Sequence, residues 1–578
     1  MYDLTITGGL VADGTGTPPR HADIGIVAGR VVAIGTLDGN GATTIDATDQ
    51  IVAPGFIDVH THFDAQAFWD TTLSPSPLHG VTSVFAGNCG FTIAPLGIGG
   101  GMANDPADGD YLMRMLARVE GMPLESLQIG VPWDWTTTAE FLDRLDGTLM
   151  PNAGFMVGHS ALRRVVMHDD ANKREATQTE IDQMVALLRD GLAAGGIGFS
   201  STWSLSHNDH TGVPVPSRHA SRAELLRLCE VTGEYPGTCL EFIPGVAPFS
   251  DETKLLMAEM SAAANRPLNW NVLPVQGQSG EQIEHQLHSA DVARQHGGRV
   301  VALTLPDTLR TRLNLRSGFV LDMLSGWDKL MALPADEKIR QLRDPDQRAR
   351  WSDAAKNTQG PIGAIGNWAN YRVLETFAEE NKPYEGRMIG EIAAERGEDP
   401  WDALAAIAVA DDLHTVITRP DTFQDRQHWE QRVGVWRDDR AIVGASDAGA
   451  HLDMIDSYGF STTLLGKAFR EHGLVPVEEA VQLITQRQAE LYGLRQRGTL
   501  TEGNHADIVV FDPTTIGAGP VETRFDLPGG APRVYGEAVG ISNVVVNGVP
   551  VVEGNQLLDA RPGVVLRSGR DTQTVTAR

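Results

Sequence analysis

The most informative segment of the chain reads Ile51-Val-Ala-Pro-Gly-Phe-Ile-Asp-Val-His-Thr-His62 and continues as Phe63-Asp64-Ala65-Gln66. Its apolar, β-branched run predicts a short buried strand that ends at His60 and His62. Residues two apart in a strand project from the same face, so the two imidazoles are able to converge on one metal ion. Paired histidines also occur as satisfied polar residues at strand ends, and the spacing alone leaves this alternative open.

Strand-like runs alternate with helix-like segments along most of the chain, which is the pattern of βα units. The eight candidate strands end near His60, Gly90, Ser160, Thr202, Phe242, Val272, Thr304 and Asp447. Eight such units predict an α/β protein with a closed (β/α)8 TIM-like barrel. The motif from Pro54 to His62 follows a β-patterned N-terminal stretch, and it resembles the first barrel strand of the metal-dependent amidohydrolases.

Both ends of the chain show short alternating runs typical of small β-structure, for example Leu4-Thr-Ile-Thr7 and Ala506-Asp-Ile-Val-Val-Phe-Asp512. We therefore predict a composite β-sandwich from residues 1–50 and 500–578, around a barrel from residues 51–499. Two separate β-caps are the alternative. Residues 307–440 are helix-patterned and poor in strands, which predicts an insertion that either covers the substrate site or is a solvated structural element.

The composition is that of a globular protein with an acidic surface. The 578 residues include 47 Lys and Arg against 75 Asp and Glu, a net charge of −28. Such a charge repels nucleic acid and anionic membranes, so we expect a small-molecule substrate as the partner, and an oligomer is compatible with the sequence. The N-terminus shows no secretory signal, and three cysteines are too few for a disulfide framework, which favours the cytoplasm.

Several motifs lie where the predicted strands end, which is where barrel enzymes place their chemistry. They are His60-Thr-His-Phe-Asp64, Gly87-Asn-Cys-Gly-Phe91, Gly130-Val-Pro-Trp-Asp-Trp135, Gly158-His-Ser160 and Ser446-Asp447. Together they resemble the N-acyl-D-amino-acid deacylase branch of the amidohydrolases, the D-aminoacylases, over nearly the whole chain.

The resemblance implies roles for four of these residues. His60 and His62 would bind a divalent metal, zinc in the first place, and Cys89 would be a thiolate ligand. Asp447 would contact the metal and act as acid and base. Two imidazoles, a thiolate and a carboxylate are a chemically sound zinc shell, and a carboxylate beside a metal-activated water can move its proton.

One departure from this branch concerns the later strands. Deacylases of the branch resemble one another in carrying further metal-binding histidines there, where this chain has Thr238-Cys-Leu-Glu241 and Asn269-Trp-Asn271. Because asparagine and tryptophan are poor zinc ligands, we expect one zinc ion rather than two. Cys239, Glu241 and Asn271 are then expected near the ion, as ligands or as substrate contacts.

Further histidines and arginines have open roles. His159 either donates to a substrate carbonyl or is a hydrogen-bonded strand-end histidine, and His451 either shuttles a proton or orients Asp447. The segment 206–210 predicts a solvated loop, with substrate gating as the alternative. Three arginines are candidates to hold a substrate carboxylate, and the sequence does not rank them: Arg163, Arg310 and Arg387.

These observations favour a metal-dependent amidohydrolase that acts on C–N bonds other than peptide bonds. The resemblance implies hydrolysis of N-acyl amino acids of the D configuration, or of related small amides. One alternative keeps the metal site but cleaves another C–N or C–O bond, as in a cyclic imide or a lactone. Another is a degenerate barrel without metal that serves as a binding protein.

Overall fold

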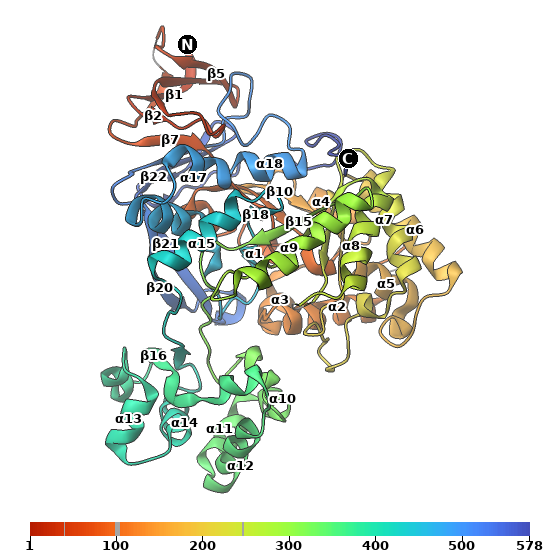
Figure 1. The fold of residues 1–578 in the computed structure, drawn as a ribbon, viewed down its shortest axis with the longest axis vertical. Coiled ribbons are helices and arrows are strands. Elements are labelled where there is room, and N and C mark those ends of the chain that lie inside the picture. Colours follow the sequence, from red (N-terminus) through yellow and green to blue (C-terminus); the bar gives the residue numbers. More distant parts are fainter. Residues whose placement is uncertain (40, 99–104, 246–247) are drawn as a thin grey trace.

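The computed structural model describes residues 1–39, 41–98, 105–245 and 248–578 (Figure 1). Eight parallel strands form its centre, and each pairs in parallel with the next. They are β8 (Phe56–Asp58), β9 (Val81–Ala86), β10 (Asn152–Phe155) continued by β11 (Val157–Gly158), β12 (Gly198–Thr202), β13 (Cys239–Ile243), β14 (Pro267–Trp270), β15 (Arg299–Thr304) and β18 (Ala441–Val443). A parallel bridge between Thr61 and Ala448 joins the last strand to the first. The predicted (β/α)8 barrel is confirmed.

Amphipathic helices cover the outside of the barrel. On one side α6 (Gln178–Ala193), α7 (Arg222–Gly233), α8 (Asp251–Ala264) and α9 (Gly280–Gln295) pack in sequence order (Figure 1). Local signals explain where such helices begin: the Thr177 hydroxyl accepts from the Glu180 backbone N–H, and the Glu180 carboxylate accepts from that of Thr177. Because the barrel strands are parallel, their carboxyl ends lie at one end of the barrel, and the polar residues that follow the strands gather there.

Strands from both chain ends build the β-domain. In its seven-stranded sheet, β7 (Ile51–Pro54) pairs antiparallel with β19 (Ile508–Phe511), which continues to β22 (Ile541–Val546). A four-stranded sheet around β1 (Tyr2–Thr7) packs on it through buried aliphatic side chains, among them Leu4, Ile26, Val52, Ile508 and Val545. The N-terminal part is thus joined to the C-terminal part by one shared sheet and one core.

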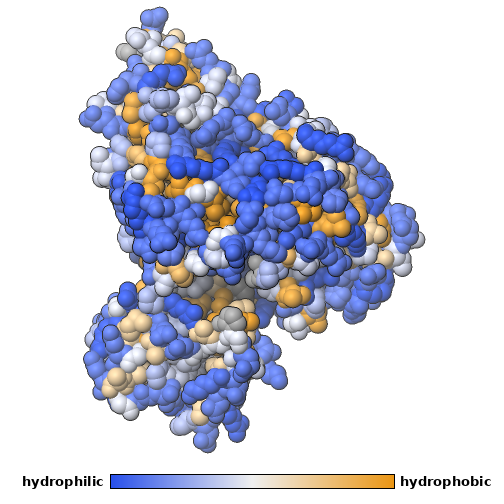
Figure 2. Space-filling view, viewed as in Figure 1, coloured by the Kyte–Doolittle hydropathy of each residue, from blue (hydrophilic) through white to orange (hydrophobic). Residues whose placement is uncertain are grey.

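A helical lobe extends from the barrel (Figure 1). It contains α10 (Trp327–Met331), α11 (Ala335–Arg343), α12 (Pro345–Lys356), α13 (Ile389–Arg396) and α14 (Pro400–Ala410), and β16 (Arg372–Glu375) pairs antiparallel with β17 (Val416–Thr418). The lobe has its own core, in which the ring centroids of Trp327 and Trp368 lie 5.1 Å apart, and those of Trp327 and Trp401 also 5.1 Å apart. Figure 2 shows a mainly hydrophilic face over barrel and lobe.

Two details differ from the domain limits expected from the sequence. Helix α15 (Arg426–Arg437), expected in the insertion, buries Trp429 and Trp436 in the core of the barrel and β-domain. The C-terminal strand β25 (Val565–Leu566), expected in the sandwich, pairs with barrel strand β10. Both segments are short and polar on one side, so local composition did not reveal which core receives their buried side. Among the described residues, no helix is both long and apolar enough to cross a bilayer.

Candidate metal centre and active site

The two histidines of the first strand meet the aspartate that follows the last strand. His60 and His62 are buried, and the backbone holds them against β18 because the Asp447 N–H donates to the His60 carbonyl. The Oδ1 atom of Asp447 lies 3.2 Å from Nε2 of His60 and 3.7 Å from Nε2 of His62. Barrel closure therefore brings these three side chains together.

Cys89 completes a set of three donor atoms, with those of His60 and His62, that lie within 4.8 Å of one another. It follows β9 with a left-handed backbone (φ 58°), and its N–H donates to Oε2 of Glu241 at 2.8 Å. Its Sγ lies 3.5 Å from Nε2 of His60 and 3.9 Å from Nε2 of His62. Zinc bonds of about 2.0 to 2.3 Å in a tetrahedron give edges of about 3.3 to 3.8 Å between ligand atoms. The separations from Cys89 to the two histidines are close to these edges, so these three residues fit a zinc ion, while Asp447 approaches the group from the side of the histidines.

The electrostatics of the four residues also suit a cation. Burial alone would raise the pKa of Asp447, but hydrogen bonds and charge from His60 and His62 hold it well below its usual range. Burial and the nearby Glu241 carboxylate raise the pKa of the Cys89 thiol, so the thiol keeps its proton without a cation, and a bound metal ion would displace that proton. Two buried oxygens next to the set, Oε1 of Glu241 and Oδ1 of Asn271, have no hydrogen-bond partner among the described residues.

Glu241 and Asn271 lie beside the candidate metal centre, as expected, while Cys239 does not, because its side chain faces the barrel core. Nδ2 of Asn271 donates to Asp447 Oδ1 at 3.2 Å and lies 3.3 Å from Nε2 of His60. Asn269 instead bonds the Leu240 carbonyl and the Tyr492 hydroxyl beneath the site. Cys239 faces the barrel core, where its thiol contacts the Ile197 carbonyl at 3.7 Å.

The structure adds Glu120, which no sequence signal had indicated. It follows α2 (Pro106–Val119) in an irregular segment, is buried, and places Oε1 3.4 Å from Nδ1 of His62. Burial raises the pKa of Glu120 to about 7, although the charge of His62 opposes the shift. No hydrogen bond joins Glu120 to Nδ1 of His62 at this separation, so the carboxylate acts on the imidazole through its charge.

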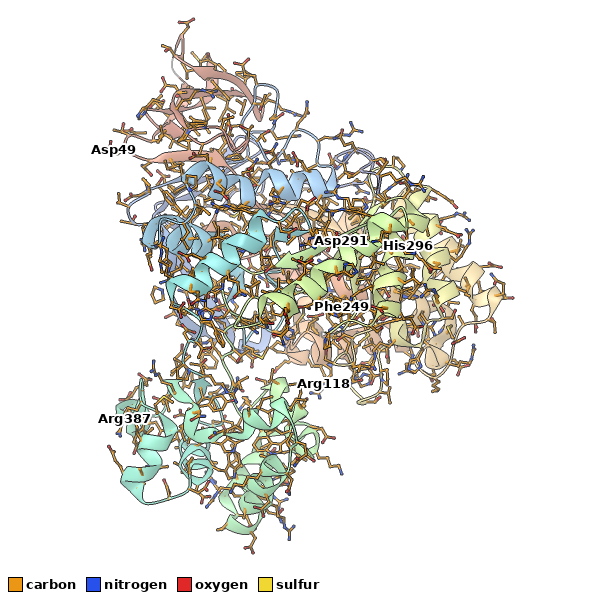
Figure 3. All side chains as sticks on the ribbon, in the orientation of Figure 1. Asp49, Arg118, Phe249, Asp291, His296 and Arg387 are labelled. Atoms are coloured by element: carbon orange, nitrogen blue, oxygen red, sulfur yellow. The ribbon has the colours of Figure 1, made fainter. Side chains whose placement is uncertain are left out.

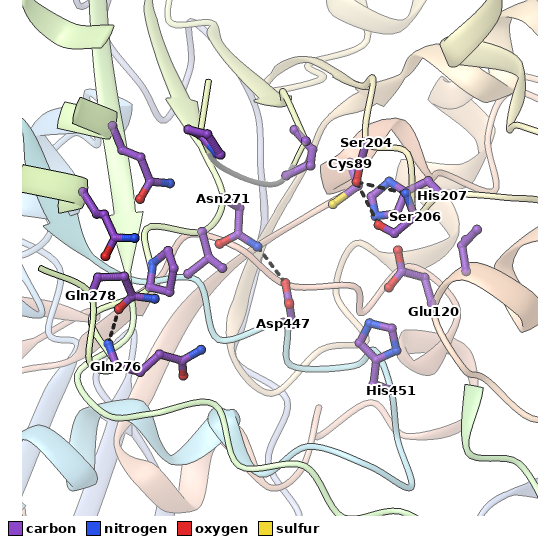
Figure 4. Close-up of a pocket in the computed structure, with 18 of the residues that line it drawn as sticks. Cys89, Glu120, Ser204, Ser206, His207, Asn271, Gln276, Gln278, Asp447 and His451 are labelled. Atoms are coloured by element: carbon purple, nitrogen blue, oxygen red, sulfur yellow. Dashed lines mark hydrogen bonds between the residues drawn. The ribbon is translucent and has the colours of Figure 1, made fainter. Parts of the chain in front are cut away.

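A cavity of about 690 Å³ opens over these residues (Figure 4). The walls of the cavity come from the loops after several barrel strands and from α9. No described residue of the helical lobe lines the cavity, so the expectation that the insertion covers the substrate site has no support in the structure. The lining residues are His62, Cys89, Val119, Glu120, Ser204, Ser206, His207, Ile243, Gly245, Pro248, Asn271, Val272, Pro274, Gln276, Gln278, Glu281, Gln282, His285, Gln286, Asp447 and His451.

Two cavity histidines are electrically neutral at physiological pH. Burial lowers the pKa of His451 to about 4 and that of His207 to about 3. His207 belongs to the segment that was expected to be a solvated loop, yet it is held inside by a bond of 2.8 Å between its Nδ1 and the Thr202 hydroxyl. The polar composition of that loop concealed its position at the cavity wall.

His159 occupies a different place from the predicted substrate contact. Its Nε2 bonds Glu224 at 2.9 Å and its Nδ1 bonds Ser201 at 2.8 Å, and it does not line the cavity. Glu224 also accepts two bonds of 2.6 Å from Arg163, so the three side chains form a buried network behind the barrel strands. The alternative of a hydrogen-bonded strand-end histidine describes this arrangement.

We expect Glu224→Gln to destabilise the fold by about 3 kcal/mol, because it leaves the buried Arg163 without its counter-charge. Burial alone would raise the pKa of Glu224. The hydrogen bonds and the charges of His159 and Arg163 have the larger combined effect, so the pKa lies below the usual value of a glutamate. A group with a lowered folded pKa stabilises at higher pH, and this stability disappears as pH falls through that pKa. Urea unfolding at pH 7 and pH 4 measures both effects. An unchanged midpoint at pH 7 would contradict the expectation, and the exposed Glu553→Gln is the control.

Comparison with known proteins agrees with this geometry. D-aminoacylase from Alcaligenes xylosoxydans xylosoxydans is 29% identical over 577 residues, covering 98% of this chain and 97% of that protein. A solved D-aminoacylase with a binuclear metal centre, characterised by one-metal activation and second-metal attenuation, superposes with a TM-score of 0.62 at 26% identity, covering 98% and 100%. The solved structure of N-acyl-D-glutamate deacylase from Bordetella bronchiseptica, in complex with zinc and a phosphonate inhibitor, superposes with a TM-score of 0.63 at 26% sequence identity. The superposition covers 98% of this chain and 100% of that protein.

The family model agrees with these likenesses. The resemblance to the D-aminoacylase branch, first inferred from short motifs, therefore extends over the whole chain and is confirmed. The model of the amidohydrolase family matches residues 43–552, which include the barrel and part of the β-domain. The chain belongs to the amidohydrolase family.

Proposed function

We propose that this protein uses one zinc ion, held by His60, His62, Cys89 and Asp447, to hydrolyse the amide bond of N-acyl amino acids, in particular of the D configuration, or of related small amides. The observation that supports it most is the convergence of two imidazole nitrogens and one thiol sulfur, with the Asp447 carboxylate 3.2 and 3.7 Å from the two imidazoles. The deacylase relatives support the class of bond. The same convergence speaks against a barrel without metal that acts only in binding.

One ion is favoured over two by the residues at the fifth and sixth strands. A second zinc would need further nitrogen or sulfur donors. Glu241 instead engages the Cys89 N–H through one oxygen, Asn271 donates to Asp447, and Cys239 points into the barrel core. The solved relative with a binuclear centre shows that this fold admits two ions, so the count is a specific proposal for this chain.

The residues around the ion divide the reaction between them. A bound zinc ion supplies an acidified water and polarises the amide carbonyl. Asp447, whose side chain is 25% exposed towards the cavity, accepts the proton of the attacking water and passes it to the leaving nitrogen. The Asn271 amide holds Asp447 in place. His451, neutral and in the cavity wall, is positioned to orient the substrate carbonyl.

The thiol ligand also bears on where the protein works. Cys89, Cys229 and Cys239 are all unpaired and buried. We infer a cytoplasmic location, because a reducing compartment keeps a thiol ligand available for its metal. The small-molecule substrate enters through the cavity described above.

The decisive test is metal content measured together with hydrolysis. We expect elemental analysis of the purified protein to give about one zinc per chain. Removal of zinc with a chelator should abolish amine release from N-acetyl amino acids or their amides, and added zinc should restore it. Two zinc ions per chain at full activity would overturn the single-ion proposal. A protein that hydrolyses none of these compounds in any metal state would overturn the function.

A further inference from the structure

Apart from the proposed zinc ion and its histidines, the described lining of the cavity offers no cationic side chain that could pair with a substrate carboxylate. None of its described lining residues is lysine or arginine, and the residues outside the described ranges, 40, 99–104 and 246–247, are all uncharged by sequence. The lining does include three carboxylates, those of Glu120, Glu281 and Asp447. Two of these flank the histidine ligands, and Glu281 is exposed where α9 begins at the rim.

The nearest arginines are committed to other partners. Arg218 lies behind the loop of His207, where its guanidinium donates to the carbonyls of Leu205 and His207 and to the side chain of Asn208. Arg118, next to the cavity residue Val119, pairs with Asp322 of the lobe. Figure 3 shows Arg118 where lobe and barrel meet.

The three arginines singled out from the sequence are also elsewhere. Arg163 is fully buried against Glu224, and Arg310 lies between the carboxylates of Asp307, Asp421 and Asp456 at 3.6 to 4.0 Å. Arg387 pairs with Glu395 in the lobe, far from the barrel (Figure 3). None of them reaches the cavity to hold a substrate carboxylate.

The cavity offers amide groups in place of cations. Gln276, Gln278, Gln282 and Gln286 line one wall, and Figure 4 shows Gln276 and Gln278 across the cavity from His451. An amide side chain presents both donors and an acceptor, so it matches a neutral amide group better than a carboxylate, which only accepts. The net charge of −28 also slows the approach of anions.

We propose that the amine half of the substrate carries no free carboxylate, so that the enzyme prefers N-acyl amino-acid amides and other N-acylated neutral amines over N-acyl amino acids. This rests on the proposed function and specifies its substrate class. A substrate carboxylate in this cavity would lose its hydration without gaining a lysine or arginine partner and would face Glu281 and Glu120, whereas a carboxamide avoids both costs.

Matched substrate pairs test the preference. Each pair consists of an N-acetyl amino acid and its primary amide, in both configurations and with several side chains, and released amine is identified by mass spectrometry. We expect kcat/KM for the amide to exceed that for the acid by at least about tenfold. An acid cleaved as well as its amide overturns the inference and leaves the proposed function standing, while cleavage of neither overturns both.

A charge reversal at the rim gives a second, independent readout. In Glu281→Lys we expect the preference for the amide to fall by about fivefold at low ionic strength, and this change to shrink in 0.5 M salt because screening weakens it. Glu553→Lys changes the net charge equally but lies on an exposed strand of the β-domain, and it should leave the ratio unchanged. An unaltered ratio in Glu281→Lys overturns the electrostatic basis of the preference.

Discussion

Asp447→Asn is expected to lower kcat by about a thousandfold when zinc is supplied in excess, so that weaker metal binding from the loss of one ligand does not limit the rate. The asparagine retains the shape of the side chain but has no carboxylate to receive a proton from water or deliver it to the leaving nitrogen, and such general acid–base catalysis contributes about 10² to 10⁴ in rate. The other three ligand residues, His60, His62 and Cys89, remain in place. Steady-state kinetics on the best amide substrate, with zinc content measured on the same sample, gives the result.

The control for this variant is Asp439→Asn. Asp439 is exposed and pairs only with Arg294 on the outside of the barrel, so its neutralisation should leave kcat unchanged. If Asp447→Asn retains a kcat within threefold of the parent enzyme, Asp447 does not carry the proton. A variant that lost zinc as well would assign Asp447 to binding more than to proton transfer.

Cys89→Ser is expected to lower the zinc affinity by at least about 100-fold, with a parallel loss of activity at limiting zinc. Serine is nearly the same size, but its hydroxyl does not ionise under these conditions and is a poor zinc donor compared with a thiolate. Mutation of residues that only hydrogen-bond to metal ligands already lowers metal affinity by about 10- to 100-fold, so loss of a direct ligand should lower the affinity at least as much. Competition with a chromophoric chelator measures the affinity.

The chain provides a matched control for this exchange. Cys229 is also buried and unpaired, but it lies in α7 within the outer helical core. Cys229→Ser therefore makes the same chemical change without touching the metal centre, and its zinc affinity should equal that of the parent. Wild-type affinity in Cys89→Ser would remove the thiol from the ligand set.

The sequence predicts the position of a residue well where the residue lies in, or directly after, a strand with a clear hydrophobic pattern. The eight strands could be located because buried parallel strands read as apolar runs, and a polar residue directly after such a run must lie at the carboxyl end of the barrel. His60, His62, Cys89 and Asp447 all have this position, so their convergence could be predicted from the order of the strands.

The long connections between strands and helices have no repeating pattern, so the positions of their side chains could not be predicted from the sequence. Glu120 and His207 reach the cavity from irregular segments, whose path depends on tertiary packing instead of a local repeat. His159 shows the opposite case, since it follows a strand but turns into the first turn of α5 (His159–Met167) and bonds Glu224. Helix α15 was assigned to the insertion because charge dominates its sequence, although its two tryptophans bury on the barrel side.

Barrel closure has a consequence for how the protein matures in the cell. The proposed metal ligands bridge the first and the last barrel strand, and Ser446, beside Asp447, bonds the His60 carbonyl across 386 residues of chain. During synthesis His60, His62 and Cys89 are made long before Asp447, so the proposed ligand set is complete only after the last barrel strand has been made. Zinc captured then ties the two ends of the barrel together and favours the closed state, because an ion bound only by the native form stabilises it.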